Sequence, residues 1–194
     1  MEPTKNDSKF KGYAKDGLDL LKFALIAILI VLPIRFFVAQ PFIVSGSSMF
    51  HTFVNNQYLI VDELSYHFHT PARNDVIIFH YPKNTSLYFI KRIIGLPNET
   101  IIISHGVVTI KNATHPDGFI LAEPYINEPF AGGDGTYTTG PDEYFVMGDN
   151  RNYSSDSRVW GNVPANLIVG RAYLRLFPLS TISILPGHVT PSTQ

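Results

Sequence analysis

Hydrophobic residues form one long uncharged run near the start of the chain and many short runs after it. The long run extends from Phe23 to Ile34. Extended to residues 18–39, it has about 22 residues, enough for a helix to cross a hydrocarbon core of about 30 Å. Lys22 and Arg35 then lie near its ends, where long cationic side chains reach the lipid headgroups. The pattern therefore predicts one transmembrane helix over residues 18–39.

The basic residues predict the orientation of this anchor. Five lysines occur up to residue 22, whereas no lysine or arginine occurs between Arg35 and Arg73. Because cytoplasmic flanks carry the excess of positive charge, residues 1–17 are expected in the cytoplasm and residues 40–194 outside the cell membrane. A buried core helix or a cleaved signal segment would also be apolar. However, Arg35 and two phenylalanines follow the run where cleavage needs small residues, which favours a retained single-pass anchor.

The short runs after residue 40 are rich in β-branched and aromatic residues and are bounded by Gly, Pro, Asn and Asp. Such runs predict strands, over residues 58–61, 76–79, 88–90, 100–103, 107–110 and 172–176. We therefore expect a mainly β domain with an antiparallel sheet or partly open barrel. Residues 112–141 are rich in Gly, Pro, Asp and Thr, which predicts a loop within a β-rich insertion over about residues 100–142. The tail from Pro186 is expected to fray.

Composition narrows the possible functions. The chain has 194 residues and a mass of 21.7 kDa, which suits one hydrophobic core plus an anchor. Its net charge is −1 and its body has no block of basic residues, which excludes nucleic acid as a partner. Without cysteine it has no disulfide, thiolate metal site or cysteine nucleophile. No metal or other cofactor is predicted, because the most polar loop offers only Asp149 and Asp156 as acidic ligands.

Two positions are candidates for nucleophilic chemistry. Ser48 lies in a run of small residues over 45–49 that permits a tight turn and an exposed hydroxyl, although non-catalytic serine-rich turns share this pattern. Lys91 and Arg92 adjoin in a predicted strand, so side-chain alternation directs one of these cations towards apolar neighbours. If that cation is Lys91, desolvation lowers its pKa and supplies a neutral amine as a base. The alternative is a solvated lysine on an edge strand.

A third polar stretch, residues 147–161, holds two acids, two arginines and several serines. This density predicts a hydrogen-bonded loop in which Asp156 and Arg158 pair and a serine steers a neighbouring amine. A histidine-based triad is not favoured. His67 and His69 share one face of a strand-like run, but no Gly-x-Ser-x-Gly turn accompanies them.

Taken in order after the anchor, these three places resemble the bacterial type I signal peptidase family, membrane-bound serine proteases with a Ser–Lys dyad. Ser48-Met49 with Thr52 resembles its nucleophile box, residues 88–97 (Tyr-Phe-Ile-Lys-Arg-Ile-Ile-Gly-Leu-Pro) its lysine box, and residues 148–161 its final box. The resemblance implies a signal peptidase I that removes signal peptides from exported preproteins at the membrane surface. Cleavage is then expected after small residues of the Ala-x-Ala type, by acyl transfer and without a cofactor.

The resemblance also implies roles for individual residues. Around the reaction it implies Ser48 as nucleophile, Lys91 as general base, Ser154 as the hydroxyl that orients the lysine, and Asp156 with Arg158 as a supporting pair. It implies shallow substrate pockets lined by Phe42, Val44, Met49, Phe89 and Ile90. We expect exclusion of water and the like charge of Arg158 to lower the pKa of Lys91.

Several positions depart from the family's pattern. His51 replaces a usual proline, and Gly46 stands where some members carry a second serine in the oxyanion hole. Asn74 and Asn98 replace turn glycines, which asparagine does well because it tolerates positive φ. The departures leave open an inactive membrane-tethered homologue that binds exported peptides. A specialised Ser–Lys processing protease, such as a self-cleaving repressor or a conjugation-type peptidase, is a further alternative.

Overall fold

The chain divides into two compact units, Met1–Ala39 and Gln40–Gln194. The computed structural model describes residues 17–29, 39–130 and 132–189. In the first unit, the described residues form a helix over residues 17–29 with exposed Leu20, Phe23 and Leu29. Across the described ranges, no helix combines the length and the apolarity needed to cross a membrane. The predicted anchor includes residues 30–38, which lie outside the described residues.

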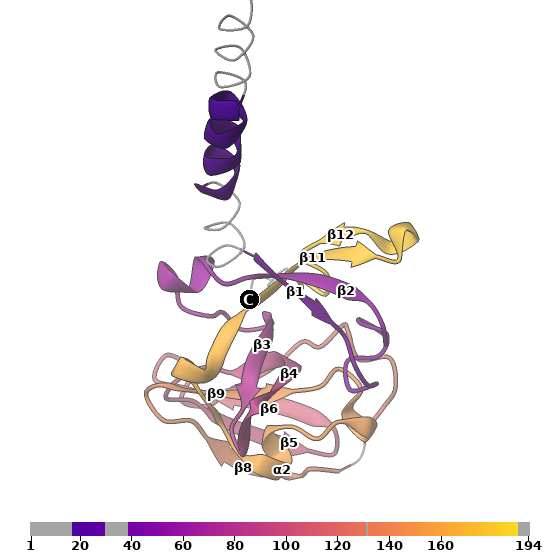
Figure 1. The fold of residues 1–194 in the computed structure, drawn as a ribbon. Helices are drawn as coiled ribbons and strands as arrows, with labels where there is room; N and C mark the ends of the chain where they lie inside the picture. The colour runs from indigo at the N-terminus through magenta and orange to yellow at the C-terminus, as the bar shows by residue number, and fades with distance from the viewer. Residues whose placement is uncertain (1–16, 30–38, 131, 190–194) are drawn as a thin grey trace, which may run out of the picture. The chain divides into compact units, whose positions relative to one another are not determined.

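The larger sheet of the second unit has eight strands in the order β1-β2-β11-β3-β4-β9-β10, with β12 paired to β11 (Figure 1). Its strands are β1 (Ala39–Ile43), β2 (Tyr58–Asp62), β3 (Val76–Tyr81), β4 (Asn84–Gly95), β9 (Glu143–Met147), β10 (Val163–Pro164), β11 (Ile168–Phe177) and β12 (Ser183–Ile184). The pairs from β2 to β10 are antiparallel. The predicted mainly β, antiparallel fold is therefore confirmed, and its sheets do not form a closed barrel.

A second antiparallel sheet follows β4 in the chain and precedes β9. It has the order β7-β6-β5-β8, from β5 (Thr100–Ser104), β6 (Val107–Lys111), β7 (Phe119–Ile120) and β8 (Gly135–Thr138). The expected loop over residues 112–141 thus contains two short strands. The sequence does not predict these two strands because they have no apolar pattern of their own. β7 forms by pairing with β6, and β8 forms by pairing with β5.

Short helical turns occupy the connections: η1 (Ser65–His67), η2 (Arg151–Tyr153), α2 (Ser157–Trp160), η3 (Ala165–Leu167) and η4 (Leu179–Thr181). Asp156 caps α2, since its side chain accepts a hydrogen bond from the Arg158 backbone N–H. Asn74 and Asn98 adopt φ of 70° and 61°, which confirms that asparagine supplies the left-handed turn conformation at both positions.

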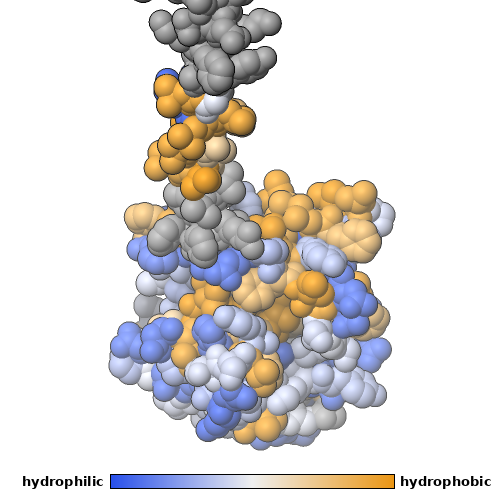
Figure 2. All heavy atoms as spheres, in the orientation of Figure 1, coloured by the Kyte–Doolittle hydropathy of each residue, from blue (hydrophilic) through white to orange (hydrophobic). Residues whose placement is uncertain are grey.

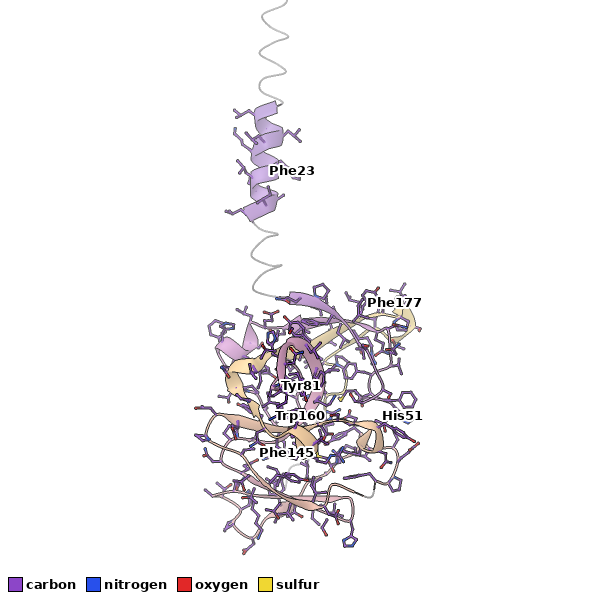
Figure 3. All side chains as sticks on the ribbon, turned by 60° about the horizontal axis from the view of Figure 1, so that its bottom comes forward. Phe23, His51, Tyr81, Phe145, Trp160 and Phe177 are labelled. Carbon is purple, nitrogen blue, oxygen red and sulfur yellow. The ribbon has the colours of Figure 1, made fainter. Side chains whose placement is uncertain are left out.

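Apolar side chains from both sheets fill three buried clusters. In one, the Tyr81 and Trp160 rings lie 5.6 Å apart, and Figure 3 shows them close together beside the strands. Another contains Met49 and Phe53, which anchor the connection between β1 and β2. Exposed apolar residues gather on the hairpin of β11 and β12 (Figure 2), namely Leu176, Phe177, Leu179, Ile182 and Ile184.

The tail differs from its expected frayed state. Up to residue 189 it is described, Pro186 is buried, and the Gly187 carbonyl accepts a hydrogen bond from Arg92. The prediction of fraying is wrong for residues 186–189. The hydrogen bond between the Gly187 carbonyl and the buried guanidinium of Arg92, 95 residues away, leaves no pattern in the sequence of this segment.

Candidate active site

Ser48 lies in a compact turn between β1 and β2. Backbone hydrogen bonds from Phe50 to Ser47 (3.1 Å) and from Phe53 to Met49 (2.8 Å) close the turn. Met49 and Phe53 are 1% and 0% exposed, so their burial holds the turn against the core while Ser48 stays partly exposed. A rigid turn of this kind can present one hydroxyl in a fixed direction.

The loop after β9 packs directly on this turn. The Asn150 N–H donates to the Ser48 carbonyl (3.0 Å), and its side-chain amide donates to the Ser47 carbonyl (3.1 Å). Gly148 is required between them, because a Cβ there would lie 2.4 Å from the Ser48 carbonyl oxygen and 2.3 Å from Ser154 Oγ. The first and third of the sequence-predicted places are therefore in contact.

Lys91 projects from β4 towards the same turn. Its Nζ lies 2.7 Å from Ser48 Oγ and 3.0 Å from the Ile90 carbonyl, and the residue is only 4% exposed. The Phe89 ring lies 5.3 Å from Nζ. Desolvation by this burial lowers the pKa of Lys91 to about 8, while Asp156 and Asp149 act in the opposite direction.

The structure buries both adjacent cations, since Lys91 and Arg92 are each at or below 4% exposure. One expectation about charge needs correction. Like-charge repulsion from Arg158 is not a cause of the lowered pKa of Lys91. Arg158 is instead paired with Asp156 at 2.8 Å, and Asp156 raises the pKa of Lys91.

Arg92 and Asp149 form a buried ion pair behind the dyad, which sequence reasoning missed. Arg92 Nε and Nη2 donate to the two carboxylate oxygens of Asp149 at 2.8 and 2.6 Å, and both side chains are 0% exposed. Thr52 Oγ1 donates to the same carboxylate at 2.5 Å. The sequence shows only that Arg92 follows Lys91 and that Asp149 follows Gly148. That the two charges meet depends on the fold.

The three supporting residues expected in the stretch 148–161 differ in the contacts they make. Asp156 and Arg158 form the expected pair, and Asp156 also accepts from the Gly148 N–H at 3.1 Å. Ser154 Oγ is buried without a hydrogen-bond partner in the described part of the chain, so it makes no bond to Lys91 here. It nevertheless lies against Gly148, beside the backbone of the nucleophile turn.

An apolar groove with a volume of about 370 Å³ opens beside Ser48 and Lys91. Its lining includes four of the residues expected to bind substrate, Phe42, Val44, Phe89 and Ile90, together with Ser48 and Lys91. Met49 is placed elsewhere: its side chain is buried in the core beneath the turn. Ser48, by contrast, lines the groove.

The histidines considered for a triad lie in another place. His67 and His69 line a separate cavity with Glu63 and Tyr66, and Lys91 rather than a histidine contacts Ser48. In the ranges that the structure describes, no group of three His, Asp or Glu residues is arranged to hold a metal ion.

Comparison with known proteins identifies the family. The model of "Signal peptidase, peptidase S26" matches residues 17–177. Signal peptidase I of Leptolyngbya laminosa is 40% identical over 196 residues, covering 95% of this chain and 90% of that protein. The protein named probable signal peptidase I-1 of Synechocystis sp. is 38% identical over 175 residues, covering 87% and 85%.

A more distant relative shows the same relationship. Signal peptidase I of Bacillus caldolyticus is 34% identical over 163 residues, covering 79% of this chain and 87% of that protein. These matches extend over most of the chain, and the family match over residues 17–177 includes the Ser48 turn, β4 and the loop after β9. The resemblance drawn from the three boxes is confirmed, and this chain belongs to the signal peptidase family, peptidase S26.

Proposed function

We propose that this chain is a signal peptidase I, a serine endopeptidase in which Ser48 is the nucleophile and Lys91 the general base. The observation that carries this proposal is the 2.7 Å contact between Lys91 Nζ and Ser48 Oγ at the floor of an apolar groove. A lysine with a pKa of about 8 is neutral in about a tenth of the molecules at pH 7, roughly 300-fold more often than a lysine with the ordinary pKa of 10.5.

Catalysis by this pair proceeds by acyl transfer. Neutral Lys91 takes the proton from Ser48 Oγ, and the oxygen attacks the scissile carbonyl. The protonated lysine then gives its proton to the leaving amine. Water repeats the sequence on the acyl-enzyme with Lys91 again as base, which releases the signal peptide and regenerates the hydroxyl.

The groove suits an extended peptide. One edge of β4 pairs with β3, and the other edge pairs with β9 only from Arg92 onward. At residues 88–90 this second edge therefore has no strand partner among the described residues. A substrate segment that pairs there by main-chain hydrogen bonds places alternate side chains in the groove. Phe42, Val44 and Ile90 line the groove, and we expect shallow pockets between them to select small residues at an Ala-x-Ala site.

The partners of this enzyme are signal-peptide-bearing preproteins and the lipid bilayer. Support comes from the apolar run at residues 18–39, which ends nine residues before Ser48. An anchor of this kind holds the groove at the outer surface of the cell membrane, where signal-peptide cleavage sites emerge. The N-terminal tail is then cytoplasmic and the catalytic domain is extracytoplasmic.

Cleavage of a precursor tests the proposal. The full-length chain in phospholipid vesicles is incubated with a preprotein that carries an Ala-x-Ala site, and mass spectrometry identifies the new N-terminus. We expect one cut directly after the second alanine, and none with Ser48→Ala. Binding of the precursor without any cut would instead show a tethered homologue that captures exported peptides.

A further inference from the structure

The segment Leu185–His188 follows the β11–β12 hairpin and folds back against the Ser48 turn and β4. The Leu185 N–H donates to the Tyr173 carbonyl of β11 at 2.6 Å, and the His188 N–H donates to the Leu185 carbonyl at 3.0 Å. Pro186 is buried. The family match ends at residue 177, so this segment lies beyond the part of the chain that the family model covers.

Gly187 touches both dyad-bearing elements. Its carbonyl accepts a hydrogen bond from Arg92 Nη1 at 2.7 Å, and Arg92 directly follows Lys91 in β4. Its α-carbon packs on the nucleophile turn, because a Cβ there would lie 2.6 Å from Thr52 Cγ2 and 3.5 Å from Phe53 Cε2. With φ of +79° as well, no side chain fits at this position without displacing its neighbours.

A second contact from the same hairpin holds the turn. Arg175 of β11 donates through Nη1 to the Thr52 carbonyl at 3.0 Å. Its Nε and Nη2 donate to Ser183 Oγ of β12 at 3.2 and 3.0 Å. Thr52 is therefore held at its carbonyl by Arg175, at its hydroxyl by Asp149, and at its methyl group by Gly187.

We propose that Gly187 is a positioning residue, and that the segment Leu185–His188 holds the Ser48 turn and β4 at the spacing that the dyad requires. This inference rests on the proposed function for its effect on catalysis. The physical reason is that Ser48 and Lys91 belong to elements 43 residues apart in the chain, whose spacing depends on the groups packed between them. Small misplacements of reacting groups cost large factors in rate.

Two variants and two matched controls test the positioning role. In the full-length chain, Gly187→Ala introduces the Cβ that meets Thr52 and Arg92, whereas Gly132→Ala adds a Cβ at another positive φ with no described atom within 4 Å. A stop codon after Ile184 removes the segment, whereas one after Val189 keeps it. We expect Gly187→Ala and the shorter chain to lose about 10- to 100-fold in kcat with KM changed less than about twofold. Both controls should match the parent chain.

Amide hydrogen exchange provides a readout that needs no substrate. The Phe53 amide is bonded to the Met49 carbonyl at 2.8 Å, and its exchange reports opening of the nucleophile turn. We expect it to exchange about tenfold faster in Gly187→Ala than in Gly132→Ala. Exchange equal to that of the control, or a loss confined to KM, would overturn the positioning role. If the parent chain cleaves no precursor, the proposed function fails, but the exchange comparison still tests the positioning role of Gly187. If the shorter chain does not fold, Gly187→Ala alone tests that role.

Discussion

At the scale of single residues, the unusual feature is Lys91, which is only 4% exposed and has no carboxylate partner of its own among the described residues. The two carboxylates that raise the pKa of Lys91, Asp156 and Asp149, are each already paired with an arginine. Their fields at Nζ are therefore partly cancelled, and desolvation is the largest influence. The same burial that lowers the pKa of the amine reduces the stability of the fold.

The stability cost of Lys91 is expected to depend on pH. Its pKa falls from 10.5 to about 8 on folding, so the unfolded chain binds the proton more tightly. The cost, about 3 kcal/mol at 1.36 kcal/mol per pKa unit, is complete below pH 8 and disappears as pH rises through 10.5. Lys91→Met should therefore stabilise the chain more at pH 7 than at pH 10.5. Urea unfolding at both pH values measures this, with exposed Lys83→Met as control; an equal effect at both would contradict it.

Activity is expected to rise with pH as Lys91 loses its proton. The acid limb of kcat/KM reports the free enzyme and should have its midpoint near the Lys91 pKa of about 8. Bound substrate excludes more water, so the limb of kcat should lie at lower pH. Initial rates of precursor cleavage between pH 6 and about 10 test this. An acid limb near the ordinary lysine value would show that Lys91 is not the base.

Replacing either member of the dyad should abolish cleavage. Ser48→Ala and Lys91→Ala are each expected to lower kcat by about 10³-fold or more, and the double variant should lose no more, because the two groups act as one unit. Lys91→His should not restore activity, since the shorter ring does not reach Ser48 from β4. Single-turnover cleavage assays measure these losses, and Ser47→Ala is the control. Loss in Ser47→Ala with retention in Ser48→Ala would identify a different nucleophile.

At the scale of elements, the site depends on close contact between the loop after β9 and the nucleophile turn. Gly148→Ala is expected to displace the Ser48 carbonyl, because its Cβ would lie 2.4 Å from that oxygen. We expect at least about a tenfold loss in kcat and a destabilisation of about 1–3 kcal/mol, typical of overpacking. Cleavage rates and urea unfolding measure both. Gly135→Ala, whose nearest neighbour is the flexible tip of Tyr137 at 3.3 Å, is the control and should change neither.

Six of the strands were predicted from runs of β-branched and aromatic residues. All six predicted runs lie inside β2, β3, β4, β5, β6 and β11. The strands β1, β7, β8, β9, β10 and β12 were not predicted, although residues 144–147 of β9 are apolar and buried, and neither was the ordered path of residues 186–189. Of these, β7, β8 and residues 186–189 form because a partner strand or a buried arginine supplies their hydrogen bonds, which is information located elsewhere in the chain.

At the scale of the whole molecule, the proposed function requires the catalytic unit to face the exported substrate. We expect a protease added to intact cells with a permeable outer layer to degrade the chain after residue 40 and to spare the tail up to about Lys15. The reason is the excess of lysines before the apolar run and their absence from residues 36–72. Immunoblots against tags at each end measure this. Protection of the catalytic unit would contradict the orientation.

The sequence by itself determined the principal strands, the candidate dyad and the expected anchor, because alternation, apolar run length and short motifs are local properties of the chain. Tertiary structure alone decided how Lys91 is surrounded. Arg92 meets Asp149 across 57 residues and Gly187 across 95, and neither contact leaves a periodic pattern. It also decided that Met49 is buried and that Ser154 is unpartnered in the described chain. The pKa of a base and the spacing of a dyad depend on desolvation and packing, which exist only once distant segments have come together.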